Sequence, residues 1–145
     1  MSVRETILAE IAARLAALPD VAEFAREATG DPTKFPAIFL TEGPHEGRSG
    51  EVQTQRYAMS VLIEGYVAGG DGADAAAARN DLYAASAAAI MSDGLNLGNF
   101  PGVEDIAEIR FRPSVAELSK ARRAAFELEL EIQFSTMRGN PALPA

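Results

Sequence analysis

The chain contains no cysteine and no tryptophan, and it has one histidine, His45. Without cysteine it can form neither a disulfide nor a thiolate metal site, so we expect a protein compatible with a reducing cytoplasm. A zinc site normally uses three or four protein ligands, and one histidine supplies too few of them. We therefore interpret His45 as a solvated loop residue and expect no bound metal.

Long apolar runs are also missing. No segment approaches the roughly 20 apolar residues that a membrane-spanning helix needs, and Met1 leads directly into a charged amphipathic segment that does not resemble a signal peptide. We expect a soluble chain without a membrane partner. Acidic residues exceed basic ones, with a net charge of −8 and a pI of about 4.6. This balance argues against binding nucleic acid through its phosphates, but it permits DNA to slide past without sticking.

Sequence signatures of catalysis are absent or weak. Residues 70–75 match a G-x-G-x-x-A pattern between a predicted strand and a predicted helix, which is the setting of a dinucleotide site. However, Asp71 and Asp74 would place negative charge where a pyrophosphate should bind, and the preceding strand is predicted to pair antiparallel. The chain has no Walker-type lysine, no nucleophile elbow and no plausible Ser/His/Asp set. We expect neither an enzyme nor a cofactor.

The strongest pattern in the sequence is an alternation of apolar and polar residues within residues 123–136. Alternate apolar side chains fall on one side of an extended chain: Phe126, Leu128, Leu130, Ile132 and Phe134. The side chains between them fall on the other side: Glu127, Glu129, Glu131 and Gln133. Because glutamate is a poor strand former, burial of the apolar side must stabilise this strand. The pattern predicts a sheet with one buried face and one face that meets water or basic neighbours.

The other elements follow from periodicity and end signals. A capping box at Ser2–Glu5 and apolar residues every three or four positions predict a helix that ends at Pro19. An alanine-rich segment with Asp71 or Asp74 at its N-cap predicts a second helix, which ends near Ser92. Three more strands are predicted, at residues 35–42, 57–67 and 103–112.

The connections between these elements are expected to be irregular. Residues 43–56 are polar and glycine-rich without periodicity, and they predict a long mobile loop between antiparallel strands. Pro113 is expected to end the third strand, and residues 114–117 are expected to form a single helical turn. The tail, residues 137–145, has two prolines and little to bury, and we expect it to be disordered or an extended arm.

Together these elements predict an α+β fold with the order α-β-β-α-β-β. We expect a mostly antiparallel four-stranded sheet with two helices packed on one face. Residues 1–136 are predicted to form a single domain, since no repeat or linker divides the chain.

Basic residues gather late in the chain, where five of the thirteen positive charges lie close together. They are Arg110, Arg112, Lys120, Arg122 and Arg123. One interpretation is cross-strand pairing of Arg110 and Arg112 with Glu127 and its neighbours. The other is a basic edge that meets an acidic patch on an identical subunit, as head-to-tail ring assembly would use.

A resemblance to a known family is carried by segments in a fixed order. They are a strand entered through Phe35-Pro36 (FPAIFLTEG), a polar loop (GPHEGRSGEVQTQR), the strand YAMSVLIEGYV, the helix end AIMSDG and the last strand AFELELEIQFST. In the order, length and character of these elements, the chain resembles the tail-terminator (tail-completion, minor tail protein U-like) proteins of long-tailed bacteriophages. The resemblance runs from the first helix to about Thr136 and includes no catalytic signature.

The resemblance implies a structural virion protein. Six copies would form a ring on the last ring of tail-tube subunits, stop tube polymerisation and present a surface to the head–tail connector. The implied partners are other copies of the chain, the tail-tube protein and the connector or neck protein, and DNA would pass through without specific binding. The implied location is the head-proximal end of the tail, after assembly in the bacterial host cytoplasm.

Two groups of residues are the predicted contacts of such a ring. Contacts with the tube or a neighbouring copy are assigned to His45, Arg48, Gln53, Arg56, Arg110, Arg112, Arg122 and Arg123. An acidic face is assigned to Glu127, Glu129 and Glu131. These carboxylates either line the channel, where they would repel the DNA backbone, or lie on the outer or intersubunit side.

Two other functions fit parts of the sequence. Another neck or head–tail joining protein would share the size, acidity and ring symmetry. A small ligand-binding α+β domain would use the glycine-rich turn at residues 69–72, and it would need an apolar, aromatic-lined pocket.

Overall fold

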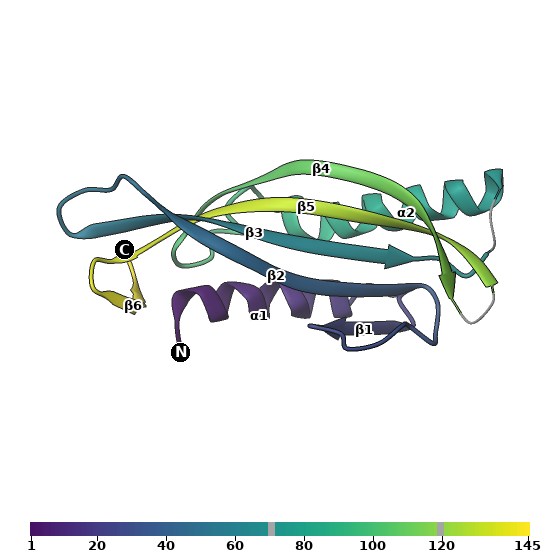
Figure 1. Cartoon of the computed structure of the whole chain (residues 1–145). Helices are drawn as coiled ribbons and strands as arrows, with labels where there is room; N and C mark the ends of the chain where they lie inside the picture. The colour runs from purple at the N-terminus through teal and green to yellow at the C-terminus, as the bar shows by residue number, and fades with distance from the viewer. Residues whose placement is uncertain (70–71, 119–120) are drawn as a thin grey trace.

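The computed structural model describes residues 1–69, 72–118 and 121–145. Within these residues two helices accompany a six-stranded mixed sheet (Figure 1). In chain order the elements are α1 (Val3–Ala16), β1 (Glu23–Arg26), β2 (Ala37–Arg48), β3 (Thr54–Tyr66), α2 (Ala73–Met91), β4 (Val103–Leu118), β5 (Ala121–Met137) and β6 (Asn140–Pro144). The predicted order α-β-β-α-β-β and the four-stranded, mostly antiparallel sheet are therefore wrong.

The sheet has the strand order β1-β2-β3-β5-β4, and β6 pairs with β5 off this path. β1 runs parallel to β2, and the other neighbours are antiparallel. β1 was not predicted from the sequence. All four of its residues are half-buried, so they show no alternation of apolar and polar side chains that would indicate a strand. β6 was not predicted either, because that strand has no buried residue and lies in the segment for which disorder was expected. Both strands depend on a neighbour for their backbone hydrogen bonds.

The predicted alternation in β5 is confirmed. Phe126, Leu128, Leu130, Ile132 and Phe134 are all at most 1% exposed and belong to the hydrophobic core. Glu127, Glu129 and Glu131 are partly exposed on the opposite side. β5 lies between β3 and β4, so the strand with the clearest sequence signal is flanked by strands on both edges.

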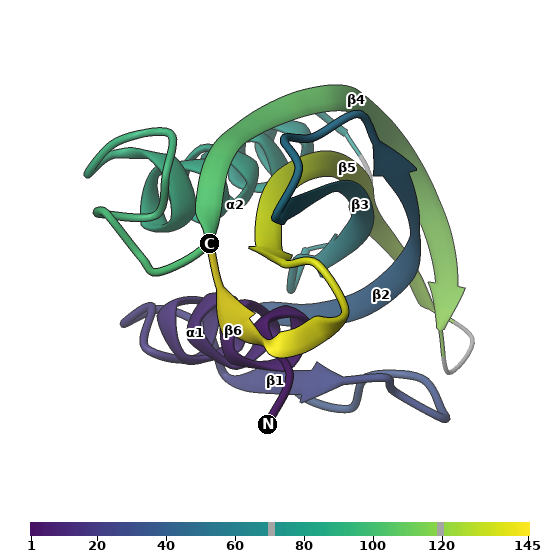
Figure 2. The same cartoon turned by 90° about the vertical axis from the view of Figure 1, so that its left-hand side faces the viewer.

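Both helices pack over the apolar side of the curved sheet, as the end-on view in Figure 2 shows. The predicted first helix is confirmed, with Ser2 as N-cap accepting a hydrogen bond from the Glu5 amide at 3.0 Å. The second helix begins after Gly72 without a side-chain cap, so Asp74 is not the N-cap, and Asp71 lies outside the described residues. Arg14 joins the two helices, because its guanidinium contacts the Ala89 carbonyl at 3.2 Å and the Asp93 carboxylate at 2.9 Å.

The predicted loop at residues 43–56 is instead most of a hairpin. β2 continues to Arg48 and β3 begins at Thr54, and Figure 1 shows this hairpin reaching past the N-terminal end of α1. A bulge between Glu42 and His45 accommodates Gly43 and Pro44, and a Cβ on Gly43 would lie 2.8 Å from the Ser60 carbonyl oxygen. Burial along β2 falls from the buried first four residues to the exposed last five. Because this part has no helix beneath it, both of its sides are polar and the alternation disappears.

The prediction that Pro113 ends a strand is also wrong. β4 continues to Leu118 and has no helical turn at residues 114–117. β4 pairs only with β5 among the described strands, and an edge strand tolerates the missing N–H of a proline. A bulge between Glu108 and Arg110 leaves Ile109 51% exposed and turns Glu108 toward α2, where the Tyr83 hydroxyl lies 2.7 and 2.8 Å from its two oxygens. Because of this bulge, Ile109 and Phe111 do not follow the regular two-residue alternation of the strand.

Candidate assembly surfaces

The sheet face that points away from the helices carries the three predicted glutamates of β5. Their cross-strand neighbours are Glu64, Leu62 and Ser60 on β3, and Arg112, Arg110 and Ala107 on β4. We call the charged members of this set the polar sheet face: Glu64, Arg110, Arg112, Glu127, Glu129 and Glu131. Carboxylates outnumber guanidinium groups here, so the face is acidic at neutral pH.

Ion pairing on the polar sheet face is weak. Arg112 Nη1 lies 3.9 Å from Glu127 Oε2, and the two side chains are 57% and 45% exposed. This is the cross-strand pairing that the sequence allowed, and at such exposure it contributes a few tenths of a kcal/mol. Arg110 lies opposite Glu129 in the β4–β5 register. These charges therefore stabilise the fold little and stay accessible to other molecules.

A hydrogen bond from Tyr66 holds the Glu64 carboxylate in place. The Tyr66 hydroxyl donates a hydrogen bond to Glu64 Oε2 at 2.7 Å. Burial of the ring, followed by the hydrogen bond to Glu64, raises the pKa of Tyr66. Tyr66 therefore stays protonated and orients the Glu64 carboxylate along the sheet.

Four of the predicted contact residues lie on the β2–β3 hairpin. Arg48 pairs with Glu46 at 3.1 Å, and Arg56 Nε lies 3.2 Å from Glu104 Oε1. The Gln53 carbonyl accepts a hydrogen bond from the Arg138 amide at 2.8 Å, which connects the turn to the end of β5. His45 lies nearer the body, opposite Met59. The hairpin is therefore an ordered projection with a charged, exposed end.

His45 lies on β2 and not in the predicted loop, whereas the residue is exposed to solvent as expected. Its ring centroid lies 4.7 Å from that of Tyr57 and 5.8 Å from that of Phe134. Arg4 Nη1 donates to His45 Nδ1 at 3.0 Å, so the neutral ring carries its proton on Nε2. Burial, and then the charge of Arg4, lower the pKa of His45.

This arrangement predicts a pH effect on stability. The unfolded chain binds a proton at His45 more readily than the folded chain, so stability should fall as the pH drops below the ordinary histidine pKa of 6.5. We expect urea denaturation between pH 7 and pH 5 to show a small loss of stability, since His45 is exposed to solvent. His45→Gln, which keeps an acceptor for Arg4, should flatten this dependence.

Other titrating groups act at lower pH. The pKa values of Glu5 and Glu23 are lowered from 4.5, the first mainly by its hydrogen bond with Arg26 and the second mainly by the Thr33 amide. Their contribution is present above pH 4.5 and is lost below it. An unchanged slope between pH 7 and pH 5 in His45→Gln would therefore contradict the assignment to His45.

A charge network joins α1, β1 and β2, and it was not predicted from the sequence. Arg26 donates to both oxygens of Glu5, at 2.7 and 2.6 Å, and to Glu42 at 2.9 Å. Arg4 reaches the same Glu42 at 3.3 Å and the Gly43 carbonyl at 2.6 Å. No spacing signal could have found these pairs, because they join residues 16 to 39 positions apart in elements that only the fold brings together. The network fixes the base of the hairpin to the first helix.

Arg122 and Arg123 lie at the other end of the molecule, at the start of β5. Arg122 is opposite Glu117 in the register. The Arg123 guanidinium covers the Phe35 ring at 3.9 Å and donates to the Ala68 carbonyl at 2.7 Å. Lys120 lies outside the described residues. The predicted contact residues therefore fall in three separate places: the hairpin, the polar sheet face and the start of β5.

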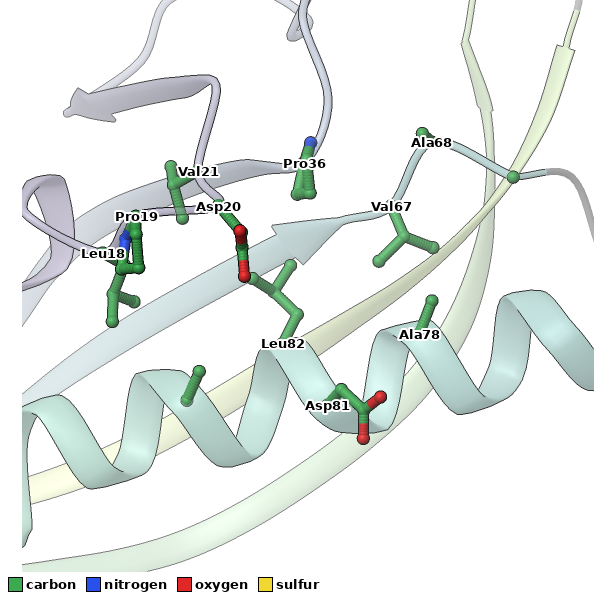
Figure 3. A pocket seen from close by; sticks show the side chains of 12 residues that line it. Leu18, Pro19, Asp20, Val21, Pro36, Val67, Ala68, Ala78, Asp81 and Leu82 are labelled. Carbon is green, nitrogen blue, oxygen red and sulfur yellow. The ribbon is translucent and has the colours of Figure 1, made fainter.

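An apolar cleft of about 390 Å³ opens near this second end (Figure 3). It is lined by the segment after α1, the beginning of β2, the end of β3 and one side of α2. The residues are Leu18, Pro19, Asp20, Val21, Pro36, Val67, Ala68, Gly69, Ala78, Asp81, Leu82 and Ala85. No described residue in this lining is aromatic, and the only charged side chains are those of Asp20 and Asp81. The cleft therefore lacks the aromatic lining that the ligand-binding alternative requires.

The strand before the G-x-G-x-x-A segment lacks the pairing that a dinucleotide site uses. β3, which precedes the G-x-G-x-x-A segment, is antiparallel to both β2 and β5, so the parallel βαβ unit of a dinucleotide site is missing from the described residues. Gly70 and Asp71 of the motif lie outside those residues.

Within the described part of the chain, no group of three or more histidine, cysteine, aspartate or glutamate side chains could hold a metal ion. Neither of the described helices has the length and hydropathy needed to cross a membrane.

Comparisons with known proteins find similarity among solved structures. No protein family and no curated protein matches the sequence. Among solved structures, the fold is similar to a chain in the virion of a native gene transfer agent particle, with 13% sequence identity and a TM-score of 0.48. The match covers 92% of this chain and 95% of that chain. At this identity and score, the likeness does not assign a function.

Proposed function

We propose that this chain is a structural tail-terminator protein of a long-tailed bacteriophage or phage-like particle. In this role it forms a ring, six copies by the family resemblance, that caps the tail tube, ends tube polymerisation and provides the surface for head attachment. The observation that carries the proposal is the two-sided β5, which combines a fully buried apolar side with an acidic, accessible side in the segment that also carries the sequence resemblance.

The polar sheet face supports this role through its charge. Glu127, Glu129 and Glu131 repeat about 7 Å apart along β5, and Arg110 and Arg112 only partly offset them. An acidic surface repels the DNA backbone and reduces sticking, which a channel for DNA requires. In the alternative placement, the same carboxylates meet the arginines of a neighbouring copy.

The role is tested by deleting the gene from the particle's own genome and examining lysates by electron microscopy. A terminator deletion should give overlong tails, because the tube continues to polymerise. Loss of a head-side adaptor, which is the alternative function, should instead give tails of normal length without heads. Normal-length tails would overturn the terminator proposal.

The charge argument is tested by reversing the acidic side of β5. Replacing Glu127, Glu129 and Glu131 with lysine should slow DNA passage and reduce infectivity if these groups line the channel. The control variant Gln133→Lys adds one charge on the same strand. Infectivity at the wild-type level in the triple variant would remove these carboxylates from the channel.

A further inference from the structure

A small pocket lies where the N-terminal end of α1 meets β6, the end of β5 and the base of the β2–β3 hairpin. Figure 2 shows β6 next to this end of α1. The pocket has a volume of about 240 Å³, whereas drug-sized ligands occupy roughly 300–1,000 Å³, so it has room only for a small ligand. We call it the α1 pocket. It is lined by Ser2, Arg4, His45, Tyr57, Phe134, Thr136 and Pro141.

One part of the α1 pocket is a wall of rings. The Tyr57 and Phe134 rings are stacked with their centroids 5.1 Å apart, and the His45 ring lies 4.7 Å from that of Tyr57. Pro141 of β6 completes the apolar part of the lining. Aromatic rings pack favourably against another ring in offset or edge-to-face geometry, so this wall favours a ligand with an aromatic group.

Thr136 places a buried hydroxyl in the same lining. It follows Phe134 by two positions on β5 and is therefore on the same side of the strand. The residue is 2% exposed, and its hydroxyl makes no side-chain hydrogen bond with any described residue. Burial of a hydroxyl without a partner is unfavourable, so almost all such groups in proteins are hydrogen-bonded. A hydroxyl in this state on a pocket wall points to a polar ligand atom that meets it.

The first turn of α1 supplies further donors. Ser2 Oγ accepts the Glu5 amide at 3.0 Å, and the Ser2 carbonyl accepts the Thr6 amide at 3.0 Å. The Val3 and Arg4 amides have no acceptor among the described residues, as is usual for the start of a helix. Such amides, together with the helix dipole, favour an anion. This end of the pocket therefore favours a negatively charged group.

His45 adds a donor to this set. Arg4 Nη1 donates to His45 Nδ1 at 3.0 Å, so the ring carries its proton on Nε2. This Nε2–H has no acceptor among the described residues. Donors thus come from a helix end, a hydroxyl and an imidazole, which no short sequence motif brings together.

The charge around the α1 pocket matches one negative charge. Arg4 and Arg26 carry two positive charges. Glu5 and Glu42 offset them through contacts of 2.6 to 3.3 Å. The N-terminus of α1 adds a partial positive charge of about 0.5. A phosphate dianion would exceed this positive charge by far, whereas a carboxylate carries a single negative charge.

We propose that the α1 pocket binds a small aromatic carboxylate. The ring of the ligand packs against Tyr57 and Phe134, and its carboxylate accepts hydrogen bonds from Thr136 and the first turn of α1. A free aromatic acid and an aromatic residue at the C-terminus of a polypeptide both have this chemistry. The inference goes beyond the proposed assembly function and does not depend on it.

The test is a titration of the ¹⁵N-labelled full-length chain with benzoate at pH 7, followed by NMR. We expect saturable shifts that are largest at the amides of Val3, Arg4 and Thr136. Benzamide has the same shape without the charge and should bind at least about tenfold more weakly. Shifts that do not saturate, shifts spread over other parts of the chain, or equal affinity for benzamide would overturn the proposal.

Thr136→Val tests the buried hydroxyl at nearly constant side-chain volume. It should weaken benzoate binding by roughly tenfold, because a hydrogen bond to a charged group is lost. The matched control is Ser135→Ala on the same strand, since Ser135 is also buried but does not line the pocket. Benzoate affinity at the wild-type level in Thr136→Val, with the fold checked by circular dichroism, would contradict the proposal.

A pair of substitutions at an exposed position tests the charge without touching the core. Pro141 is exposed and lines the pocket, so Pro141→Glu adds a negative charge there and should weaken benzoate binding several-fold relative to Pro141→Gln. Equal binding by these two variants would count against an anion in the pocket.

N-acetylphenylalanine distinguishes the two sources of the ligand. If it binds as benzoate does, with the same loss in Thr136→Val, the pocket accepts the end of a polypeptide. If only benzoate binds, the ligand is a free acid. Lack of binding by both overturns the proposal and leaves the tail-terminator role standing, because that role is measured by tail length.

Discussion

Replacing Leu130 with alanine is expected to lower the free energy of unfolding by about 2–5 kcal/mol. Leu130 lies near the middle of β5 with no exposed surface, between Val61 on β3 and Glu108 on β4. Truncation removes buried apolar surface and leaves a cavity that the flanking strands cannot fill, because their backbones are fixed by pairing on both sides. Urea denaturation followed by far-ultraviolet circular dichroism measures the change.

The matched control for this substitution is its neighbour on the other side of the strand. Glu131→Ala changes a partly exposed side chain that has no ion pair among the described residues, so we expect a change within about 0.5 kcal/mol. The contrast between the two alanine variants tests the two-sided character of β5 itself. Equal losses of stability at positions 130 and 131 would contradict it.

Replacing Gly65 with alanine is expected to destabilise the protein by about 1–3 kcal/mol. Gly65 lies opposite Phe126 in the β3–β5 register, and a Cβ at this position would overlap the Phe126 ring. The β3–β5 register has no bulge at this position, so the glycine serves the close approach of the Phe126 ring. Phe126 is 1% exposed, so its ring has no solvent-filled space into which to move.

A double-mutant cycle separates this clash from a general effect of alanine. In a Phe126→Leu background the cost of Gly65→Ala should shrink, because the smaller side chain leaves room for the Cβ. Gly30→Ala is the control, since a Cβ there meets nothing within 4 Å and the residue does not have a left-handed φ. We expect this control to be neutral or slightly stabilising. Additive effects of the changes at positions 65 and 126 would contradict direct contact.

The candidate surfaces were predictable only in part. The acidic side of β5 could be predicted because its glutamates alternate with the buried apolar residues of the same strand. The positions of the arginines were not, since the bulge at Glu108/Arg110 sets which β4 side chains lie opposite Glu127 and Glu129. The cleft is built from four segments distant in sequence, so no local pattern indicates it.

The sequence by itself determined the elements whose signals are local. Ser2 and the apolar stripe of α1 specify a capped helix, and the alternation from Phe126 to Phe134 specifies a strand with one buried side. Only the tertiary structure decided that β1 and β6 are strands, that the hairpin extends to Arg48 and that β4 continues past Pro113. These segments take their backbone hydrogen bonds from neighbouring strands and bury few side chains, so no periodicity in their own residues records the pairing.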